Sequence, residues 1–233
     1  MPSTQGPQSV IAVYKKFKEI SKMSRYTGPA CKKCQKLSQK MFLKGTRCYT
    51  NCPVEKQSTD KHFAANGPKA KMSDYGKHLR EKQIARFSAG MSEAQFHRFF
   101  VNAAKTPGGT GETLMRYLEI RLDNIVRRLG FAVSLAAARQ IVTHGHIKVN
   151  GRCVNIPSYL VRIGDEISID SKMLATAGVI QGLEYADKVA AAARPSFLAW
   201  DPDKKVGKLV RWPDRSESSV KADDQLIIEY YSK

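Results

Sequence analysis

The sequence lacks the features of a membrane-bound or secreted protein. Its 233 residues contain no run of about 18 apolar residues, which a membrane-spanning helix needs. No basic amphipathic helix suited to a membrane surface stands out either. The first twenty residues lack the apolar stretch and small-residue cleavage site of a secretory signal. We therefore expect no membrane partner and a reducing compartment, in which the five cysteines are thiols or metal ligands.

Enzymatic motifs are also missing. The five histidines are scattered, and none has a carboxylate or nucleophile at a telling spacing. The sequence contains no glycine-rich loop of a phosphate-binding pattern, and we interpret residues 107–111, PGGTG, as a hinge. We therefore expect a protein without catalytic residues.

Acidic residues are scarce beside basic ones. There are 39 Lys and Arg against 21 Asp and Glu, a net charge of +18, and a folded body with that excess predicts a polyanionic partner, nucleic acid first of all. Residues 1–110 carry an excess of +15, residues 111–170 of +2 and residues 171–233 of +1. The sequence therefore places the electrostatic anchor before residue 111. The alternative is a merely solvated surface.

The chain divides into four stretches after an extension at residues 1–22. Residues 23–72 are basic and contain four cysteines. In residues 73–113, the run HLREKQIARF predicts a helix around residues 77–87, and Ser92 with Gln95 has the spacing of a capping box at the start of another. We expect a helical domain there, completed by residues 173–233, with the glycine cluster at 107–111 as its boundary.

Residues 114–172 predict two helices on a small antiparallel sheet, which makes the fold class α+β. Leu114, Leu118, Leu122, Ile125 and Leu129 form one apolar stripe, typical of a single helix. Gly130 ends that helix, Ser134 caps a second one, and Gly145 stops it. Asn150-Gly151 between two short apolar runs predicts a hairpin with a type I′ turn, and a third strand follows at 165–169.

The last sixty residues predict a helix at 176–193, irregular chain around three prolines, and a terminal strand at 225–231.

The cysteines at 31, 34, 48 and 52 have the spacing C-x2-C-x13-C-x3-C. Two close pairs of soft ligands are typical of a tetrahedral, structural zinc site. An iron–sulfur cluster and unligated thiols are the alternatives. We interpret the remaining cysteine, Cys153, as a small core residue.

Longer motifs carry a family resemblance over residues 23–233. Residues 119–169, EIRLDNIVRRLGFAVSLAAARQIVTHGHIKVNGRCVNIPSYLVRIGDEISI, closely resemble the RNA-binding module named after bacterial-type ribosomal protein S-four. MSRYTGPACKKC at 23–34, LREKQ at 79–83, WPDR at 212–215 and LIIEYYSK at 226–233 resemble other parts of that family. The resemblance implies a structural protein of the small ribosomal subunit, located in the cytoplasm.

The same resemblance implies partners and a role. It implies a primary binder of small-subunit ribosomal RNA that nucleates subunit assembly. It places the protein among other small-subunit proteins, beside ribosomal protein S-five and near the entry channel for messenger RNA, where it influences decoding accuracy.

The residues expected to contact RNA are basic side chains, two histidines and one tyrosine. Arg121 and Arg128 lie seven apart on the expected helix, Arg116 and Arg127 eleven apart, so each pair shares a helix face. The predicted RNA-binding residues are Arg25, Tyr26, Lys44, Arg80, Lys82, Arg116, Arg121, Arg127, Arg128, Arg139, His144, His146, Lys148 and Arg152; the predicted metal ligands are Cys31, Cys34, Cys48 and Cys52.

Two rival functions remain at this point. The module also occurs in pseudouridine synthases and tRNA synthetases, but only 64 residues follow Ile169, too few for a catalytic domain. An RNA-binding chaperone of stalled ribosomes is the other rival, and the cysteine pattern and the carboxy-terminal tail argue against it.

Overall fold

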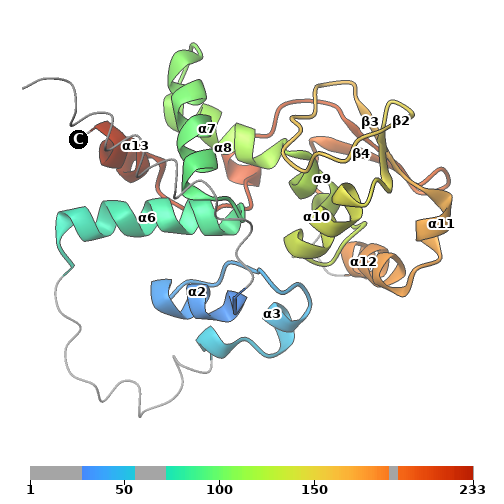
Figure 1. Ribbon diagram of the computed structural model, residues 1–233, viewed down its shortest axis with the longest axis horizontal. Coiled ribbons are helices and arrows are strands. Elements are labelled where there is room, and N and C mark those ends of the chain that lie inside the picture. Colours follow the sequence, from blue (N-terminus) through green and yellow to red (C-terminus); the bar gives the residue numbers. More distant parts are fainter. Residues whose placement is uncertain (1–27, 56–71, 189–193, 233) are drawn as a thin grey trace, which may run out of the picture.

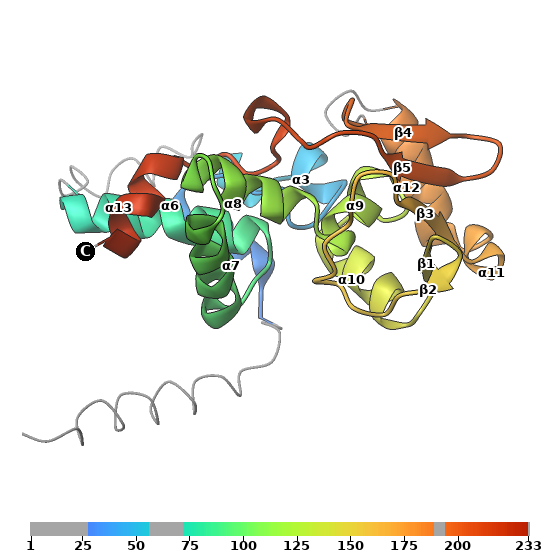
Figure 2. The same cartoon turned by 90° about the horizontal axis from the view of Figure 1, so that it is seen from above.

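The structure, a computed structural model, describes residues 28–55, 72–188 and 194–232. Two lobes lie side by side, and a cysteine-rich segment, residues 28–55, lies against both (Figures 1 and 2). The helical lobe consists of α6 (Asp74–Ser88), α7 (Glu93–Lys105), α8 (Thr110–Glu119) and α13 (Asp224–Ser232). The sheet lobe consists of α9 (Leu122–Arg128), α10 (Leu135–Thr143), β1 (Ile147–Val149), β2 (Arg152–Cys153), β3 (Glu166–Ile169), α11 (Ser171–Leu174), α12 (Ala177–Lys188), β4 (Leu198–Asp201) and β5 (Val206–Leu209). The cysteine-rich segment contains α2 (Ala30–Leu37) and α3 (Arg47–Thr50), and a short 3-10 turn, η2 (Arg215–Glu217), lies between the lobes.

Serine side chains begin the first two helices of the helical lobe. The Ser73 hydroxyl accepts a hydrogen bond from the Gly76 amide at 3.2 Å, and the Ser92 hydroxyl accepts one from the Gln95 amide at 3.4 Å. Each bond satisfies an amide that has no partner within its own helix. The predicted helix at 77–87 and the predicted start at Ser92 are both confirmed.

The single helix expected over residues 113–129 is wrong. The structure has two helices, α8 and α9, separated by an extended Arg121 with φ −63° and ψ 139°. The break arises because Leu122 donates to the Tyr159 carbonyl at 2.8 Å, while Val161 donates to the Ile120 carbonyl at 3.0 Å. These distant partners replace bonds of a continuous helix. The boundary between the two apolar cores therefore lies at residues 119–121, and not at the glycine cluster.

The first half of the sheet lobe follows the sequence closely. Ser134 caps α10 by accepting from the Ala137 amide at 3.3 Å. Asn150 and Gly151 have φ values of 50° and 77°, as a type I′ turn requires, and they join β1 to β2. The predicted third strand is β3, which pairs with β1. The second predicted helix, the hairpin and the third strand are confirmed.

Two strands complete the sheet from a region expected to be irregular. The strand order is β2-β1-β3-β5-β4, and every described pair is antiparallel. A Cβ atom at Gly207 of β5 would lie 2.3 Å from a methyl carbon of Leu129, so glycine lets Leu129, the residue just after α9, pack directly on the strand. Phe197, Leu198 and Leu209 belong to the core of the sheet lobe. This part of residues 173–233 therefore completes the sheet lobe, and not the helical domain as expected.

The predicted terminal strand at 225–231 is also wrong, because this stretch forms helix α13. Ile227 is fully buried in the core of the helical lobe, and the Tyr231 ring packs on Phe96 and Phe100 with centroid distances of 6.4 Å and 4.5 Å. The apolar run is short enough to suit either element by itself. Packing against α6 and α8 selects the helix.

Several expectations lie outside the described residues. They are the extension at 1–22, Arg25, Tyr26, part of the basic stretch at 56–71, and the end of the predicted helix at 189–193. Among the described residues, no helix is both long and apolar enough to cross a membrane.

Candidate RNA interface and lobe junction

Arg121 lies inside the protein, at the break between α8 and α9. Its side chain is 2% exposed, and its guanidinium donates two hydrogen bonds to Asp123, Nε to Oδ1 at 3.1 Å and Nη2 to Oδ2 at 2.8 Å. The guanidinium also lies 5.6 Å from the centroid of the Phe99 ring. A phosphate cannot reach this group, so the prediction that Arg121 contacts RNA is wrong.

Arg139 connects the two lobes. Its Nε donates to Asp123 Oδ2 at 2.7 Å within the sheet lobe. The other guanidinium nitrogens donate to the carbonyls of Ala89, at 2.9 Å, and Gly90, just beyond the end of α6. A cation at the end of a helix satisfies its terminal carbonyls and is favoured by the helix dipole. In this structure Arg139 therefore acts as a clamp between lobes.

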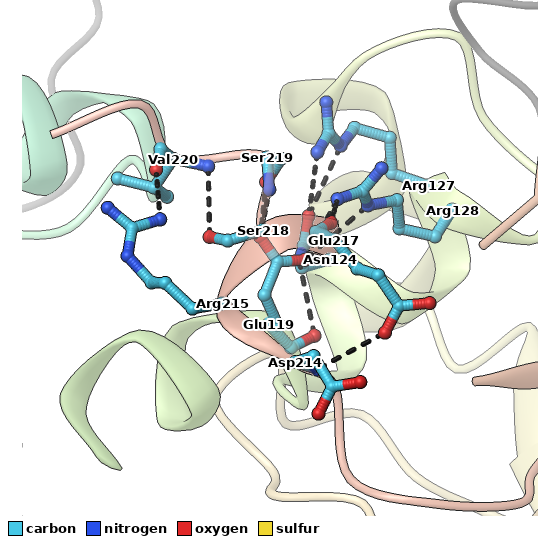
Figure 3. Close-up of polar contacts among 10 residues, drawn as sticks. All are labelled: Glu119, Asn124, Arg127, Arg128, Asp214, Arg215, Glu217, Ser218, Ser219 and Val220. Carbon is cyan, nitrogen blue, oxygen red and sulfur yellow. Dashed lines mark hydrogen bonds and ion pairs between the residues drawn. The ribbon is translucent and has the colours of Figure 1, made fainter. Parts of the chain in front are cut away.

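Glu119 is the centre of a second buried network at the junction (Figure 3). Its carboxylate accepts from the Ser219 amide and hydroxyl, each at 2.6 Å, from the Ser218 hydroxyl at 3.2 Å and from Asn124 Nδ2 at 2.7 Å. Arg128 lies 3.3 Å away and also donates to the Glu217 carbonyl at 2.7 Å. The network joins α8, α9 and the segment that follows η2.

The electrostatics of Glu119 follow from these contacts. Burial by itself raises the pKa of this carboxyl, because it penalises the charged form. The Arg128 cation, the Ser219 hydrogen bonds and Arg127 outweigh burial, and they hold the pKa of Glu119 below its ordinary value. Glu119 is therefore a carboxylate at neutral pH, and its negative charge is part of the hydrogen-bond and ion-pair network between the lobes.

Two more of the predicted RNA-binding residues are held by the helical lobe. Lys82 is 4% exposed, and its ammonium donates to Glu93 Oε1 at 2.8 Å and lies 4.4 Å from the centroid of the Tyr230 ring. The prediction for Lys82 is therefore wrong. Arg80 is half-buried and donates to the Leu37 carbonyl of the cysteine-rich segment at 3.1 Å and 3.3 Å.

The remaining predicted residues reach the surface to different degrees. Arg116 and Arg127 are half-buried; Arg116 pairs with Glu112 at 3.0 Å, and Arg127 donates to Asn124 Oδ1 at 2.9 Å. His146 is half-buried as well. The exposed members are Lys44, His144, Lys148 and Arg152. The last three lie at the end of α10 and on β1 and β2, the edge of the sheet.

The cysteine-rich segment carries exposed cations that the sequence analysis did not single out. Lys32, Lys36 and Arg47 are exposed, as is Lys44, and none of the four forms an ion pair with a described residue. The one acidic residue among 28–55 is Glu55, which pairs with Lys40 at 2.5 Å. The charge excess before residue 111 was the signal that could have identified them.

The four predicted metal ligands line one small pocket of the cysteine-rich segment. Cys34, Cys48 and Cys52 are buried, Cys31 is half-buried, and the Lys44 amide donates to Cys48 Sγ at 3.3 Å. Burial raises the pKa of the Cys34 and Cys48 thiols. Within residues 28–55, 72–188 and 194–232, however, no three cysteine, histidine or acidic side chains are arranged so that they could hold a metal ion. The residue types and their shared pocket nevertheless suit a tetrahedral metal ion.

Cys153 differs from its prediction as a core residue. It is exposed on the edge strand β2, and its thiol donates to the Gly145 carbonyl at 3.0 Å.

Comparison with known families divides the chain where the structure does. Residues 25–119 match the family described as "Ribosomal protein S4/S9 N-terminal domain", and residues 120–167 match the "S4 domain". The limit between them falls at the break between α8 and α9. The chain belongs to the ribosomal protein S-four family. This family consists of structural proteins and not enzymes, as expected from the absence of a catalytic motif.

Curated relatives agree along most of the chain. A protein of Acidobacterium capsulatum named "Small ribosomal subunit protein uS4" is 45% identical over 91% of this chain and all of its own length. Proteins of Natranaerobius thermophilus, with the same name, and Symbiobacterium thermophilum, named "Small ribosomal subunit protein uS4A", are each 44% identical over the same shares.

Proposed function

We propose that the protein is a structural component of the small subunit of the cytoplasmic ribosome and that it binds ribosomal RNA. Family membership supports the general assignment. The observation that supports the RNA contact is the group of exposed cations in the cysteine-rich segment, Lys32, Lys36, Lys44 and Arg47, with no ion pair to a described residue. Cations that are not neutralised within the protein are available to phosphates.

The binding mode follows from the chemistry of RNA. A-form RNA hides its base edges in a deep groove, so a rigid basic surface recognises the shape of the helices and their phosphates. The cysteine-rich segment would supply most of the phosphate contacts. Lys148, Arg152 and His144 at the sheet edge would form a second contact. The buried arginines of the junction would keep the two lobes in place.

We also propose the partners and role that the family resemblance implies. They are a primary contact with small-subunit ribosomal RNA that starts assembly, and a position beside ribosomal protein S-five and other small-subunit proteins. From that position near the messenger RNA entry channel, the protein would contribute to decoding accuracy.

A structural zinc ion is a further part of this proposal. Cys31, Cys34, Cys48 and Cys52 would hold it, because thiolates bind zinc tightly and these four share a pocket. The ion would supply a cross-link to a segment with few large apolar residues. Zinc at about one equivalent in purified protein, lost in a Cys48→Ser variant, would support the site. An iron absorbance instead would favour an iron–sulfur cluster. The absence of both zinc and iron from the purified protein would refute the proposal.

Titration with salt tests the RNA contact. A variant with Lys32, Lys36, Lys44 and Arg47 changed to Gln should bind the ribosomal RNA junction about tenfold more weakly at physiological salt, with a salt slope lower by about 3. The control changes Lys105, Lys172, Lys204 and Lys221 to Gln, which removes the same charge from other exposed positions. Equal losses in both variants would mean that net charge, and not this surface, governs binding.

A further inference from the structure

Two chain crossings connect the lobes, and the hydrogen bonds from Arg139 to Ala89 and Gly90 connect them as well. The chain crosses once at residues 119–122, between α8 and α9, and returns through residues 210–219, between β5 and the segment after η2. The Glu119 network ties these two crossings together (Figure 3). Two neighbouring crossings resemble a hinge, because they fix the separation of the lobes better than the angle between them.

The cysteine-rich segment, with α2 and α3, lies across both lobes below α6 and α10 in Figure 1, whereas α8 and α9 lie above them. On the helical lobe, its Cys34, Leu37 and Met41 are part of the same apolar cluster as the core of that lobe. The Leu37 carbonyl accepts from Arg80 on α6 at 3.1 Å, and the Gln39 side-chain amide donates to the Lys221 carbonyl at 2.7 Å. One end of the segment is thus fixed to the helical lobe.

The other end of the segment packs on the sheet lobe. Gly45 adopts a positive φ of 61°, and a Cβ atom at this position would lie 2.4 Å from the Val133 carbonyl oxygen in the loop before α10. The Tyr49 ring of α3 packs between Phe42 and Tyr185 of α12, with centroid distances of 4.7 Å and 5.5 Å. These contacts form a seam between the cysteine-rich segment and the sheet lobe, defined by Gly45, Tyr49, Val133 and Tyr185.

We propose that the cysteine-rich segment is a strut that, together with the Arg139 contacts, fixes the orientation of the sheet lobe relative to the helical lobe, with Gly45 and Tyr49 as its positioning residues. A segment attached to both lobes away from the hinge resists rotation about it. Only the consequence for RNA affinity rests on the proposed function. Because neither residue is a cation, weakening the seam changes affinity without changing the number of phosphates neutralised.

The distance between the lobes tests the strut directly. Nitroxide amino acids introduced by codon reassignment at Ala104 of α7 and Ser171 of α11, both exposed, leave the cysteines untouched. Pulsed electron spin resonance on the full chain should give a narrow distance distribution for the parent. It should be clearly broadened or shifted in both Gly45→Ala and Tyr49→Ala.

Two controls separate the seam from general effects. Gly164→Ala also introduces a side chain at a positive φ, 94°, but its Cβ would meet nothing within 4 Å. Tyr75→Ala removes an exposed ring that contacts Tyr230, away from the seam. Both controls should keep the parent distribution. If Gly45→Ala does not fold, Tyr49→Ala decides the result.

Binding to ribosomal RNA is measured on the same variants. The seam variants should lose about tenfold in affinity with an unchanged salt slope. A parent-like distance distribution in Tyr49→Ala would overturn the strut. An altered distribution with parent affinity would overturn its role in binding, while failure of the parent itself to bind RNA would contradict only the proposed function.

Discussion

The junction and the cysteine-rich segment use positive charge in opposite ways. At the junction, Arg121, Arg128 and Arg139 are largely buried and each has a carboxylate partner. In the cysteine-rich segment, exposed cations have no partner among the described residues. Arginine suits the first task because its planar fork donates several hydrogen bonds at once. The comparison teaches that a basic residue in an RNA-binding module can serve the fold, and its burial decides which task it serves.

The largest expected effect is at Asp123, which is fully buried and holds two arginines. Asp123→Asn should lower the free energy of unfolding by about 3–5 kcal/mol, because it leaves buried guanidinium charge without compensation. Urea denaturation measures the change. As a control, Glu166→Gln removes the exposed pair with Lys208, which is worth about 1 kcal/mol or less. Similar losses in both variants would mean that the buried ion pairs of the junction stabilise the protein no more than an exposed pair does.

A smaller effect is expected at Glu119. Glu119→Gln should cost about 2–3 kcal/mol at neutral pH, because one amide nitrogen would face the donors of Ser219 and Arg128. The lowered pKa sets the pH dependence. Stabilisation by the carboxylate is fully present above its ordinary pKa of 4.5 and is lost as the pH falls through the lower folded-state value.

The difference in stability between parent and Glu119→Gln should therefore shrink as the pH falls below 4.5. Urea midpoints of both proteins over a series of acidic buffers provide the measurement. A difference that stays constant down to about pH 3 would contradict the account of this carboxylate.

The sequence predicted features that depend on neighbouring residues. Ser92, Ser134 and the Asn150-Gly151 turn satisfy local backbone requirements, so their elements appear where expected. The break at Arg121 depends on Tyr159 and Val161, some forty residues away, and α13 is selected by packing on α6. The periodicity of the local sequence carries no information about either of these distant contacts. For the same reason, the sequence alone could not show that Arg121 is buried and Arg152 is exposed.

The edge of the sheet carries fewer exposed cations than the cysteine-rich segment, so its expected contribution to RNA binding is smaller. Changing Lys148 and Arg152 together to Gln should leave the free energy of unfolding within about 0.5 kcal/mol, since both side chains are exposed. The salt slope of RNA binding should fall by about 1.5. A slope equal to that of the parent would restrict the RNA contact to the basic amino-terminal half.

The central claim is tested most directly by one pair of matched substitutions, Arg47→Gln and Arg139→Gln, measured for both stability and salt-dependent RNA binding. Arg47 is exposed without an ion pair to a described residue, so its loss should lower the salt slope by about 0.7–0.9 and change stability by less than about 0.5 kcal/mol. Arg139 clamps the lobes, so its loss should cost about 3 kcal/mol in stability and leave the slope unchanged. An equal fall in slope for both variants would contradict the division between exposed RNA-binding cations and buried junction arginines.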